Sequence, residues 1–473
     1  MYTIIHIITL PGKNSFWRLI GYLVLTLLLV SCESFLETGA PKTQLSSENV
    51  YQDDEAATAV VRGIYSEMMR GQEFLSGGHS SIPLLCGLSG DVFENRSTAL
   101  DRITFYENEL QTTNAMVLSA FWQPAYQYIY SANAVLEGVS DTAALSPDTC
   151  KQLEGEALFI RALSHFYLVN LFGDIPLALT TDYQENTALE RSPVSRVYQQ
   201  IIADLKGATE RLTATDTYGE RIRPNKWAAA ALLARVYLYT EDWPAAEATA
   251  TSVIDQASLY QLEPDLDKVF TSDSPETIWQ LKPVSPGRNT WAAVTYIPQG
   301  DTAPAWVYLS PSLMSAFETG DLRKTSWTGA VTVNGKTFYY PLKYKVYEAN
   351  QPLTEYNVIL RLAEQYLIRA EARAMQNNIA PAIADLNALR ERAGLSALAA
   401  SLSQAQALEA IRDERRAELF AEGGHRWLDL KRTGRADHTL GLLKPGWQPT
   451  DVLYPIPDLE IQTNPNLTQN EGY

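Results

Sequence analysis

Cys32 is the residue whose surroundings most clearly predict a chemical modification. It follows the apolar run Leu19–Val30, which carries no charge, and the small residue Ser31 stands directly before it. Two basic residues and no acidic residue lie upstream of that run. This layout is typical of a bacterial secretory signal. We therefore expect residues 1–31 to be removed as a lipoprotein signal peptide and the Cys32 thiol to be lipidated.

A lipidated Cys32 would anchor the mature chain, residues 32–473, to a membrane. The uncharged run of 12 residues is too short to cross a bilayer, since a crossing helix needs about 20 apolar residues. Each buried acyl methylene contributes about 0.8 kcal/mol, so palmitate and further acyl chains on one cysteine would bind firmly. Two alternatives are an uncleaved N-terminal anchor and an ordinary secreted protein in which this cysteine is incidental.

Aromatic and polar side chains in two irregular segments, residues 71–115 and 284–308, are the candidates for ligand binding. Flat aromatic faces can stack on sugar rings, while Asp and Asn side chains hydrogen-bond to hydroxyl groups. We expect a shallow aromatic patch from the two segments, with weak and reversible binding. The candidates are Asp91, Phe93, Asn95, Trp291, Tyr296, Trp306 and Tyr308. The alternative for each aromatic is a place in the core, which we expect for Trp122, Tyr126 and Tyr130 because they follow helical spacing.

Composition and motifs argue against several other classes of function. The chain has 55 acidic and 38 basic residues and a net charge of −17, which disfavours nucleic acid, because binding phosphates needs a basic patch. The segment Gly87–Gly90 lacks the GxSxG spacing of a serine hydrolase. Cys86 and Cys150 are too far apart for a metal motif and either form a disulfide or remain free thiols. We expect no enzyme activity, no metal and no cofactor.

Charged residues inside apolar helices are better explained by structure than by catalysis. Arg161 and His165 lie one turn apart in an apolar helix, where a buried arginine must satisfy carboxylates or carbonyls of a neighbour. We expect the same role in two further groups on helix faces. These groups are Arg361, Glu364 and Glu371, and Arg415, Glu418 and Glu422.

Hydrophobic periodicity predicts helices over most of the chain. The expected ranges are 53–70, 121–136, 147–172, 193–212, 226–239, 243–254, 360–375, 379–392 and 405–422, followed by loops beyond Gly424. These helices include three successive pairs, and the two later pairs, within 226–254 and 360–392, carry small residues where their helices must approach closely. The segment 262–356 differs, because it is rich in Pro, Ser, Thr and aromatic residues. Within it, Asn334-Gly335 between two β-prone stretches predicts a hairpin.

Seven blocks of sequence, in order behind the signal, resemble the RagB/SusD family. They are Cys32 with ESFLE, FWQPAYQYIYSANAVLEGV, GEALFIRALSHFYLVNLFGDIPL, RPNKWAAAALLARVYLYTEDWPAAEATA, VILRLAEQYLIRAEARA, ERRAELFAEGGHRWLDLKRTGR and LYPIP. The resemblance covers essentially the whole mature chain. It implies a mainly α, SusD-like fold in which four tetratricopeptide-like helix pairs form a scaffold, plus an irregular loop-rich region with a small β-hairpin.

The same resemblance implies a function in nutrient uptake. The mature chain would be a single domain, with a helical scaffold at about 50–260 and 357–435 and a ligand-binding insert at about 262–356. It would be lipid-anchored to the outer membrane, facing the cell surface, and would pass a nutrient, most often an oligosaccharide or polysaccharide, to a SusC-like TonB-dependent transporter without catalysing a reaction. A peptide ligand, a periplasmic tetratricopeptide scaffold and a surface glycosidase are the alternatives.

Overall fold

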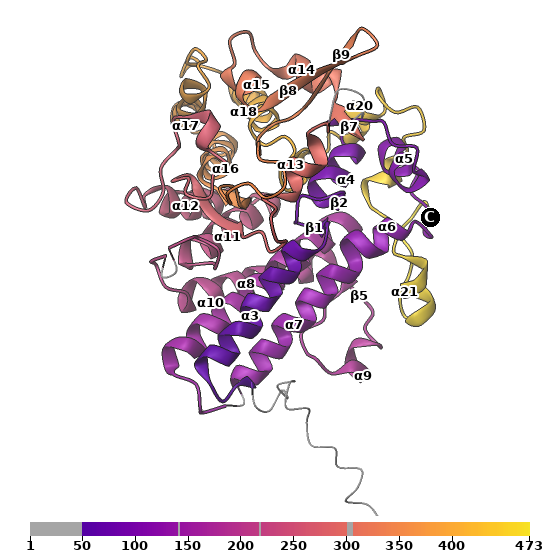
Figure 1. The fold of residues 1–473 in the computed structure, drawn as a ribbon, viewed down its shortest axis with the longest axis vertical. Coiled ribbons are helices and arrows are strands. Elements are labelled where there is room, and N and C mark those ends of the chain that lie inside the picture. Colours follow the sequence, from indigo (N-terminus) through magenta and orange to yellow (C-terminus); the bar gives the residue numbers. More distant parts are fainter. Residues whose placement is uncertain (1–49, 141, 217–218, 300–305) are drawn as a thin grey trace, which may run out of the picture. The chain divides into compact units, whose positions relative to one another are not determined.

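The computed structural model describes residues 50–140, 142–216, 219–299 and 306–473 (Figure 1). Residues 51–473 form one unit. Helices dominate this unit and strands are few and short, as the sequence predicts. Cys32 and the signal segment lie outside the described residues.

The first group of long helices contains α3 (Asp54–Arg70), α7 (Gln123–Ser140), α8 (Pro147–Phe172) and α10 (Val194–Arg211). The helix α8 is buried nearly all round and packs against both α7 and α10. Its start is fixed by the Ser146 side chain, which accepts a hydrogen bond from the Thr149 amide, and by Pro147 in the first turn. Gly173 ends it with a φ of +73°, a conformation that glycine adopts without strain.

The second group contains α11 (Lys226–Tyr239), α12 (Trp243–Ile254), α16 (Leu362–Met375), α17 (Ile379–Arg392) and α18 (Gln404–Glu418). Alanines let these helices approach closely, and Ala363, Ala370, Ala374 and Ala382 all lie in one apolar core with leucine and isoleucine side chains. The helix α16 packs against α11, α12, α17 and α18. The predicted helix pairs are therefore confirmed as packed neighbours, while their likeness to tetratricopeptide repeats stays a prediction.

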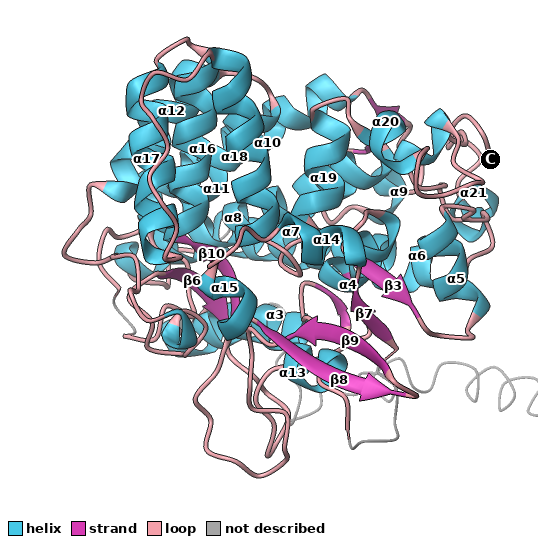
Figure 2. Cartoon of the chain, turned by 90° about the horizontal axis from the view of Figure 1, so that it is seen from above, coloured by secondary structure: helices cyan, strands magenta, loops and turns pink. Residues whose placement is uncertain are grey.

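Strands of the expected insert lie together on one side of the helices in Figure 2. The predicted hairpin is confirmed as β8 (Thr328–Val333) and β9 (Lys336–Pro341), with Asn334 and Gly335 both at positive φ in the turn. The strands β6 (Thr277–Leu281) and β10 (Asn357–Arg361) pair antiparallel, so β10 connects the insert directly to α16.

Short elements complete the fold. They are β1 (Glu73–Phe74), β2 (Ser80–Ser81), α4 (Ile82–Ser89), β3 (Phe93–Asn95), α5 (Leu100–Glu107), α6 (Ala115–Val117), a π-helical turn (Leu118–Trp122), β4 (Ile175–Pro176), α9 (Tyr183–Asn186), β5 (Arg191–Ser192), a 3₁₀ turn (Leu266–Lys268), α13 (Trp291–Tyr296), β7 (Val307–Leu309), α14 (Pro311–Ala316), α15 (Leu322–Ser326), α19 (His425–Arg432), α20 (Ala436–Leu440), a second 3₁₀ turn (Pro449–Val452) and α21 (Asp458–Thr463).

Two expectations about irregular structure are wrong. The segment 71–115 contains α4 and α5, and all eight residues of α4 are buried, so its sequence shows no amphipathic period. The chain beyond Gly424 is not only loops, because α19 starts at His425 immediately after the two glycines. The helix α18 ends at Glu418, four residues earlier than expected, and Gly423 and Gly424 adopt positive φ and turn the chain into α19.

Candidate functional site

The two irregular segments that carry the candidate ligand residues meet in the structure. The strand β3 pairs antiparallel with β7, and Phe93 lies opposite Leu309 while Asn95 lies opposite Val307. The ladder continues beyond β3, because the Arg96 amide donates a hydrogen bond of 2.7 Å to the Trp306 carbonyl. Residues about 200 positions apart in sequence thus form one surface.

Trp306 is the candidate aromatic residue that this surface leaves most accessible. Its side chain is 43% exposed. The imidazole ring of His79 stacks on the indole at 4.1 Å between centroids, and the Arg102 guanidinium lies 4.0 Å from the indole centroid. We use the name Trp306 surface for the group His79, Asn95, Arg96, Arg102 and Trp306.

The polar side chains of the Trp306 surface differ in their hydrogen-bond partners. Asn95 is half-buried and exchanges two hydrogen bonds with the backbone of Ser97. Arg96 is exposed, with its guanidinium 4.9 Å from the Phe338 ring centroid. Arg102 is buried, and its Nε has no hydrogen-bond partner within the described residues. Burial lowers the pKa of His79 to about 4, and the positive charge of Arg102 contributes to that shift, so the imidazole is neutral at pH 7.

Three of the candidate aromatics are buried, which corrects the expectation that their rings face a ligand. Phe93 stacks on Tyr296 at 5.4 Å between centroids. Tyr308 stacks on Phe338, from the β9 strand, at 4.7 Å. The candidate rings are 1%, 3% and 1% exposed for Phe93, Tyr296 and Tyr308, so in this structure they support the surface from below.

The remaining two candidates are also tied into the fold. Asp91 is buried and accepts hydrogen bonds from Arg426 at 2.6 and 3.0 Å and from Arg416 at 2.7 Å. Burial alone would raise the pKa of Asp91, but the two arginines outweigh it and lower the pKa. Trp291 is half-buried, and its Nε1 donates to the Met69 carbonyl at 2.9 Å, which joins α13 to the end of α3.

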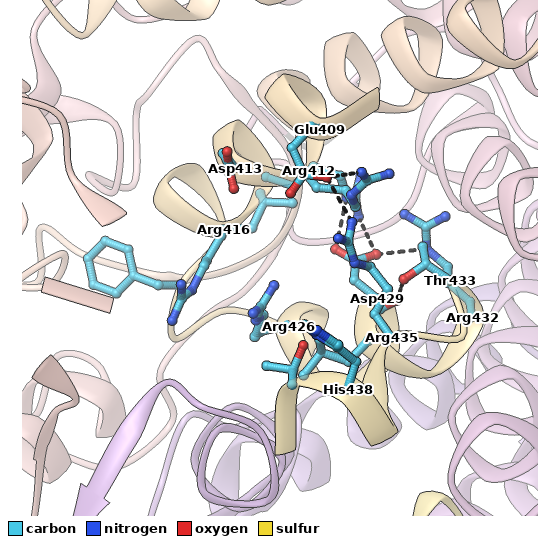
Figure 3. A pocket seen from close by; sticks show the side chains of 15 residues that line it. Glu409, Arg412, Asp413, Arg416, Arg426, Asp429, Arg432, Thr433, Arg435 and His438 are labelled. Atoms are coloured by element: carbon cyan, nitrogen blue, oxygen red, sulfur yellow. Dashed lines mark hydrogen bonds and ion pairs between the residues drawn. The ribbon is translucent and has the colours of Figure 1, made fainter. Parts of the chain in front are cut away.

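A cavity of about 230 Å³ lies among α18, α19 and α20, apart from the Trp306 surface. Figure 3 shows its charged lining. Six arginines line it: Arg412, Arg415, Arg416, Arg426, Arg432 and Arg435. Each of them pairs with a carboxylate of Glu409, Asp429, Glu371 or Asp91. Every arginine thus has a carboxylate partner, with four carboxylates shared among six arginines, and the cavity contributes to the scaffold.

The structural role predicted for the charged helix residues is confirmed. Arg161 in α8 donates two hydrogen bonds to Asp204 in α10, at 2.8 and 2.7 Å. Glu364 in α16 pairs with Arg235 in α11. The other members also bridge separate elements, as in Glu371–Arg432, Arg361–Glu418, Arg361–Glu422 and Arg415–Asp429. His165 is fully buried beside them, and burial lowers its pKa to about 3.

The sequence did not identify two tyrosines that are exposed in the structure. Tyr130 was expected in the core but is 55% exposed, and Tyr183 in α9 is 72% exposed. Both line a cavity of about 370 Å³ with Trp122, which is buried as expected, and Tyr126, which is half-buried. Helical spacing predicts on which face of α7 Tyr130 lies. It does not predict whether another element covers that face.

Two further findings concern the cysteine thiols and the length of the apolar helices. Cys86 and Cys150 are both free thiols, which decides between the two alternatives that the sequence left open. Within the described ranges, no helix combines the length and apolarity needed to cross a bilayer.

Comparison with known proteins decides the family. A SusD-like protein of Formosa agariphila is 30% identical to this chain over 516 residues, which cover 96% of this chain and 99% of the relative. The chain belongs to the SusD/RagB family. Two family models agree: one, described as starch-binding and associating with the outer membrane, matches residues 88–238, and the SusD family model matches residues 312–473.

Solved structures of SusD superfamily proteins have the same fold. One from Bacteroides vulgatus has a TM-score of 0.79 at 22% identity and covers 89% of this chain and 99% of its own. A laminarin-binding SusD-like protein has a TM-score of 0.76 at 24% identity, with the same two coverages. The SusD-like fold inferred from the sequence is therefore confirmed, with α3 to α18 as its helical frame.

Proposed function

We propose that this SusD-family chain is a lipoprotein of the outer membrane that binds a glycan at the cell surface and delivers it to a SusC-like TonB-dependent transporter. The observation that supports glycan binding is the half-exposed indole of Trp306. It lies where two segments that are distant in sequence meet in the folded chain. Two findings support this proposal: one matching family model is described as starch-binding, and one structural neighbour is a laminarin-binding protein.

The Trp306 surface provides the two kinds of contact that a sugar needs. The exposed part of the indole offers apolar area to a pyranose ring. Arg96, Arg102 and Asn95 offer donors and an acceptor for hydroxyl groups, and the Nε of Arg102 has no hydrogen-bond partner within the described residues. A surface with one accessible ring buries little of a ligand, so binding is weak and readily reversed, which suits transfer to a transporter.

The anchor and the domain organisation are parts of the same proposal. Residues 1–31 are a signal peptide, Cys32 is the lipidated residue, and residues 32–473 are a single domain whose insert, at about 262–356, contributes to the ligand surface. Of the candidate residues, Asn95, Trp291 and Trp306 keep accessible atoms. We assign direct ligand contact to Asn95 and Trp306 and a supporting role to Trp291.

The chain binds its ligand without turning it over. Among the described residues, the carboxylates of Asp91 and Glu364 form ion pairs with arginines of the scaffold. They are therefore not available as catalytic groups. Incubation with a panel of polysaccharides should release no new reducing ends. Release of sugars would instead support the surface glycosidase.

A substitution at Trp306 tests the glycan site. In affinity gel electrophoresis against neutral polysaccharides, Trp306→Ala should abolish the retardation of the native protein, whereas Trp306→Phe should keep part of it because a ring remains. Leu442→Ala is the control, since Leu442 is 78% exposed and lies outside the Trp306 surface. Unchanged retardation of Trp306→Ala would contradict this site, and retention by peptides in place of polysaccharides would favour the peptide alternative.

Anchoring and partnership are tested in cells. Cys32→Ala should leave glycan binding in solution unchanged and impair uptake of the glycan, because the protein is no longer held at the membrane beside its transporter. Protease added to intact cells should digest the native protein, whereas a periplasmic scaffold would be protected. A tagged native chain should retain a SusC-like protein on purification, and recovery of the chain alone would contradict the proposed partner.

A further inference from the structure

The cavity that contains Tyr130 and Tyr183 lies apart from every residue of the Trp306 surface. It has a volume of about 370 Å³ and is lined by α7, by the segment from β4 through α9, and by α21 with the residues that follow it. In Figure 1 these elements lie beside one another. We call this cavity the tyrosine pocket. Its size falls within the usual range for small-molecule sites.

Four aromatic side chains line the tyrosine pocket. Trp122 and Tyr126 pack together at 5.0 Å between ring centroids and form one wall. Tyr130 and Tyr183 are 55% and 72% exposed and come from two different elements. A folded chain that leaves two large rings exposed around one hollow retains apolar area that a ligand can cover.

Polar groups of the pocket are suited to hydroxyl groups. The Asn186 amide donates from Nδ2 to the Thr180 carbonyl, but its buried Oδ1 accepts no hydrogen bond. A buried acceptor without a partner is uncommon, because leaving it unsatisfied costs free energy. The carboxyl of Glu460 also lines the pocket, and the exposed Gln123 supplies an amide.

The charge of the lining restricts the chemical class of the ligand. Of the residues that line the pocket, Glu460 is the acidic one, and none is a lysine, an arginine or a histidine. An anionic sugar would therefore meet a carboxyl and no balancing cation, which is unfavourable. Aromatic faces combined with amide, hydroxyl and carboxyl groups match a neutral sugar ring.

We propose that the tyrosine pocket binds a neutral hexose unit and is a second saccharide site, distinct from the Trp306 surface. This inference extends the proposed function, because it assumes that the chain handles glycans, but it concerns different residues. Two sites on one chain would let it hold two parts of a long glycan, or two chains, at once, which raises the apparent affinity without tighter individual contacts.

The test uses saturation-transfer NMR with the methyl glycosides of glucose, galactose and mannose, since this method detects weak binding. At least one glycoside should receive saturation from the native protein. The signal should persist in Trp306→Ala, and adding Tyr130→Ala/Tyr183→Ala to that variant should reduce it at least tenfold. Tyr130→Phe/Tyr183→Phe is the matched control, because it keeps both rings and removes only the hydroxyl groups, and it should retain most of the signal.

Other outcomes would overturn the inference. These are a signal that disappears in Trp306→Ala, a signal unchanged when the two tyrosine substitutions are added to Trp306→Ala, or no signal from any glycoside. Binding of choline in place of the glycosides would identify an aromatic cage for cations and would also overturn it. The proposed function is judged separately by polysaccharide electrophoresis of Trp306→Ala, so the two hypotheses can fail independently. Circular dichroism confirms that each variant is folded.

Discussion

The Arg102 guanidinium lies 4.0 Å from the centre of the Trp306 indole, and the two side chains come from segments about 200 residues apart. A cation over a tryptophan face is worth about 0.5–1 kcal/mol at an exposed site and more when it is desolvated. Burial lowers the pKa of Arg102 below its usual value, although the neighbouring Asp101 opposes this. The pair thus fixes the indole and holds a positive charge beside it.

Removing the charge of Arg102 should weaken glycan binding more than it destabilises the fold. Arg102→Met keeps a flexible apolar stem against the indole but removes the cation and its donors. We expect about tenfold weaker binding, equivalent to about 1.4 kcal/mol, measured by isothermal titration with the polysaccharide that the native protein binds best. Arg62→Met is the matched control for charge, because Arg62 is exposed and lies in α3, outside the Trp306 surface. Equal affinity of the native protein and Arg102→Met would contradict a direct role.

The ion pair between Arg161 and Asp204 is the clearest case in which a buried charge stabilises the scaffold. Its side chains are 9% and 3% exposed, and Arg161 also donates to Asn133 in α7. Asp204→Asn should lower the free energy of unfolding by about 3 kcal/mol or more, because it leaves an arginine charge buried without a counterion. Urea unfolding, followed by circular dichroism, measures the change.

An accessible pair between the same helices serves as the control for Asp204→Asn. Arg211 in α10 pairs with Glu154 in α8 at 2.6 Å, with side chains 38% and 31% exposed. Glu154→Gln should cost less than about 1 kcal/mol, because solvent already screens this pair. Similar losses in Glu154→Gln and Asp204→Asn would show that burial does not set the strength of the interaction.

The sequence predicts the scaffold well because its helices carry strong local signals. The bounds expected for α8, α11, α12 and α17 coincide with those observed, since capping residues, prolines and glycines mark their ends. The helix α4 was missed because an entirely buried helix has no polar face and therefore no period. The helices α8 and α11 are also largely buried, but they are longer and have capping side chains, whereas α4 has only eight residues and no side-chain cap.

The candidate site was only partly predictable for a different reason. Loop composition pointed to both Trp306 and Tyr308, but it could not show that Trp306 is exposed while Tyr308, two residues further on, is covered by Phe338 of β9. The same difficulty affects Tyr130, whose exposure depends on α9 and α21, far away in sequence. Exposure is decided by contacts between distant segments, and no local pattern encodes them.

The turn of the β8–β9 hairpin should need glycine at position 335 because of the backbone angle there and not because of limited space. Gly335 has a φ of +76°, and an added Cβ would meet no atom within 4 Å. Gly335→Ala should therefore cost about 1–2 kcal/mol of local stability, the usual penalty for a side chain in the left-handed region. Hydrogen exchange should become faster in residues 328–341 and stay unchanged in α8. Asn334→Gly is the control and should not accelerate exchange in α8 either.

The buried imidazole of His165 should make stability fall as the pH is lowered from 7 to 5. Burial lowers its pKa to about 3, with a contribution from Arg161, compared with 6.5 for a free histidine. Between pH 6.5 and 3 the unfolded chain therefore binds a proton that the folded chain does not, so the free energy of unfolding decreases as the pH falls. For one such group the loss reaches about 2 kcal/mol at pH 5. Neither ring nitrogen has a hydrogen-bond partner within the described residues.

Replacing His165 by leucine tests this pH dependence. His165→Leu removes the titrating group and two unsatisfied polar atoms, so it should be neutral or stabilising at pH 7 and should be more stable than the native protein at pH 5. Urea unfolding at pH 7, 6 and 5 measures the slope. His438 lies on the short helix α20 and is exposed, so His438→Leu should leave the slope unchanged. A native slope that persists in His165→Leu would assign the acid sensitivity to other groups, of which His79 and His425, each with a pKa lowered to about 4, are the next to test.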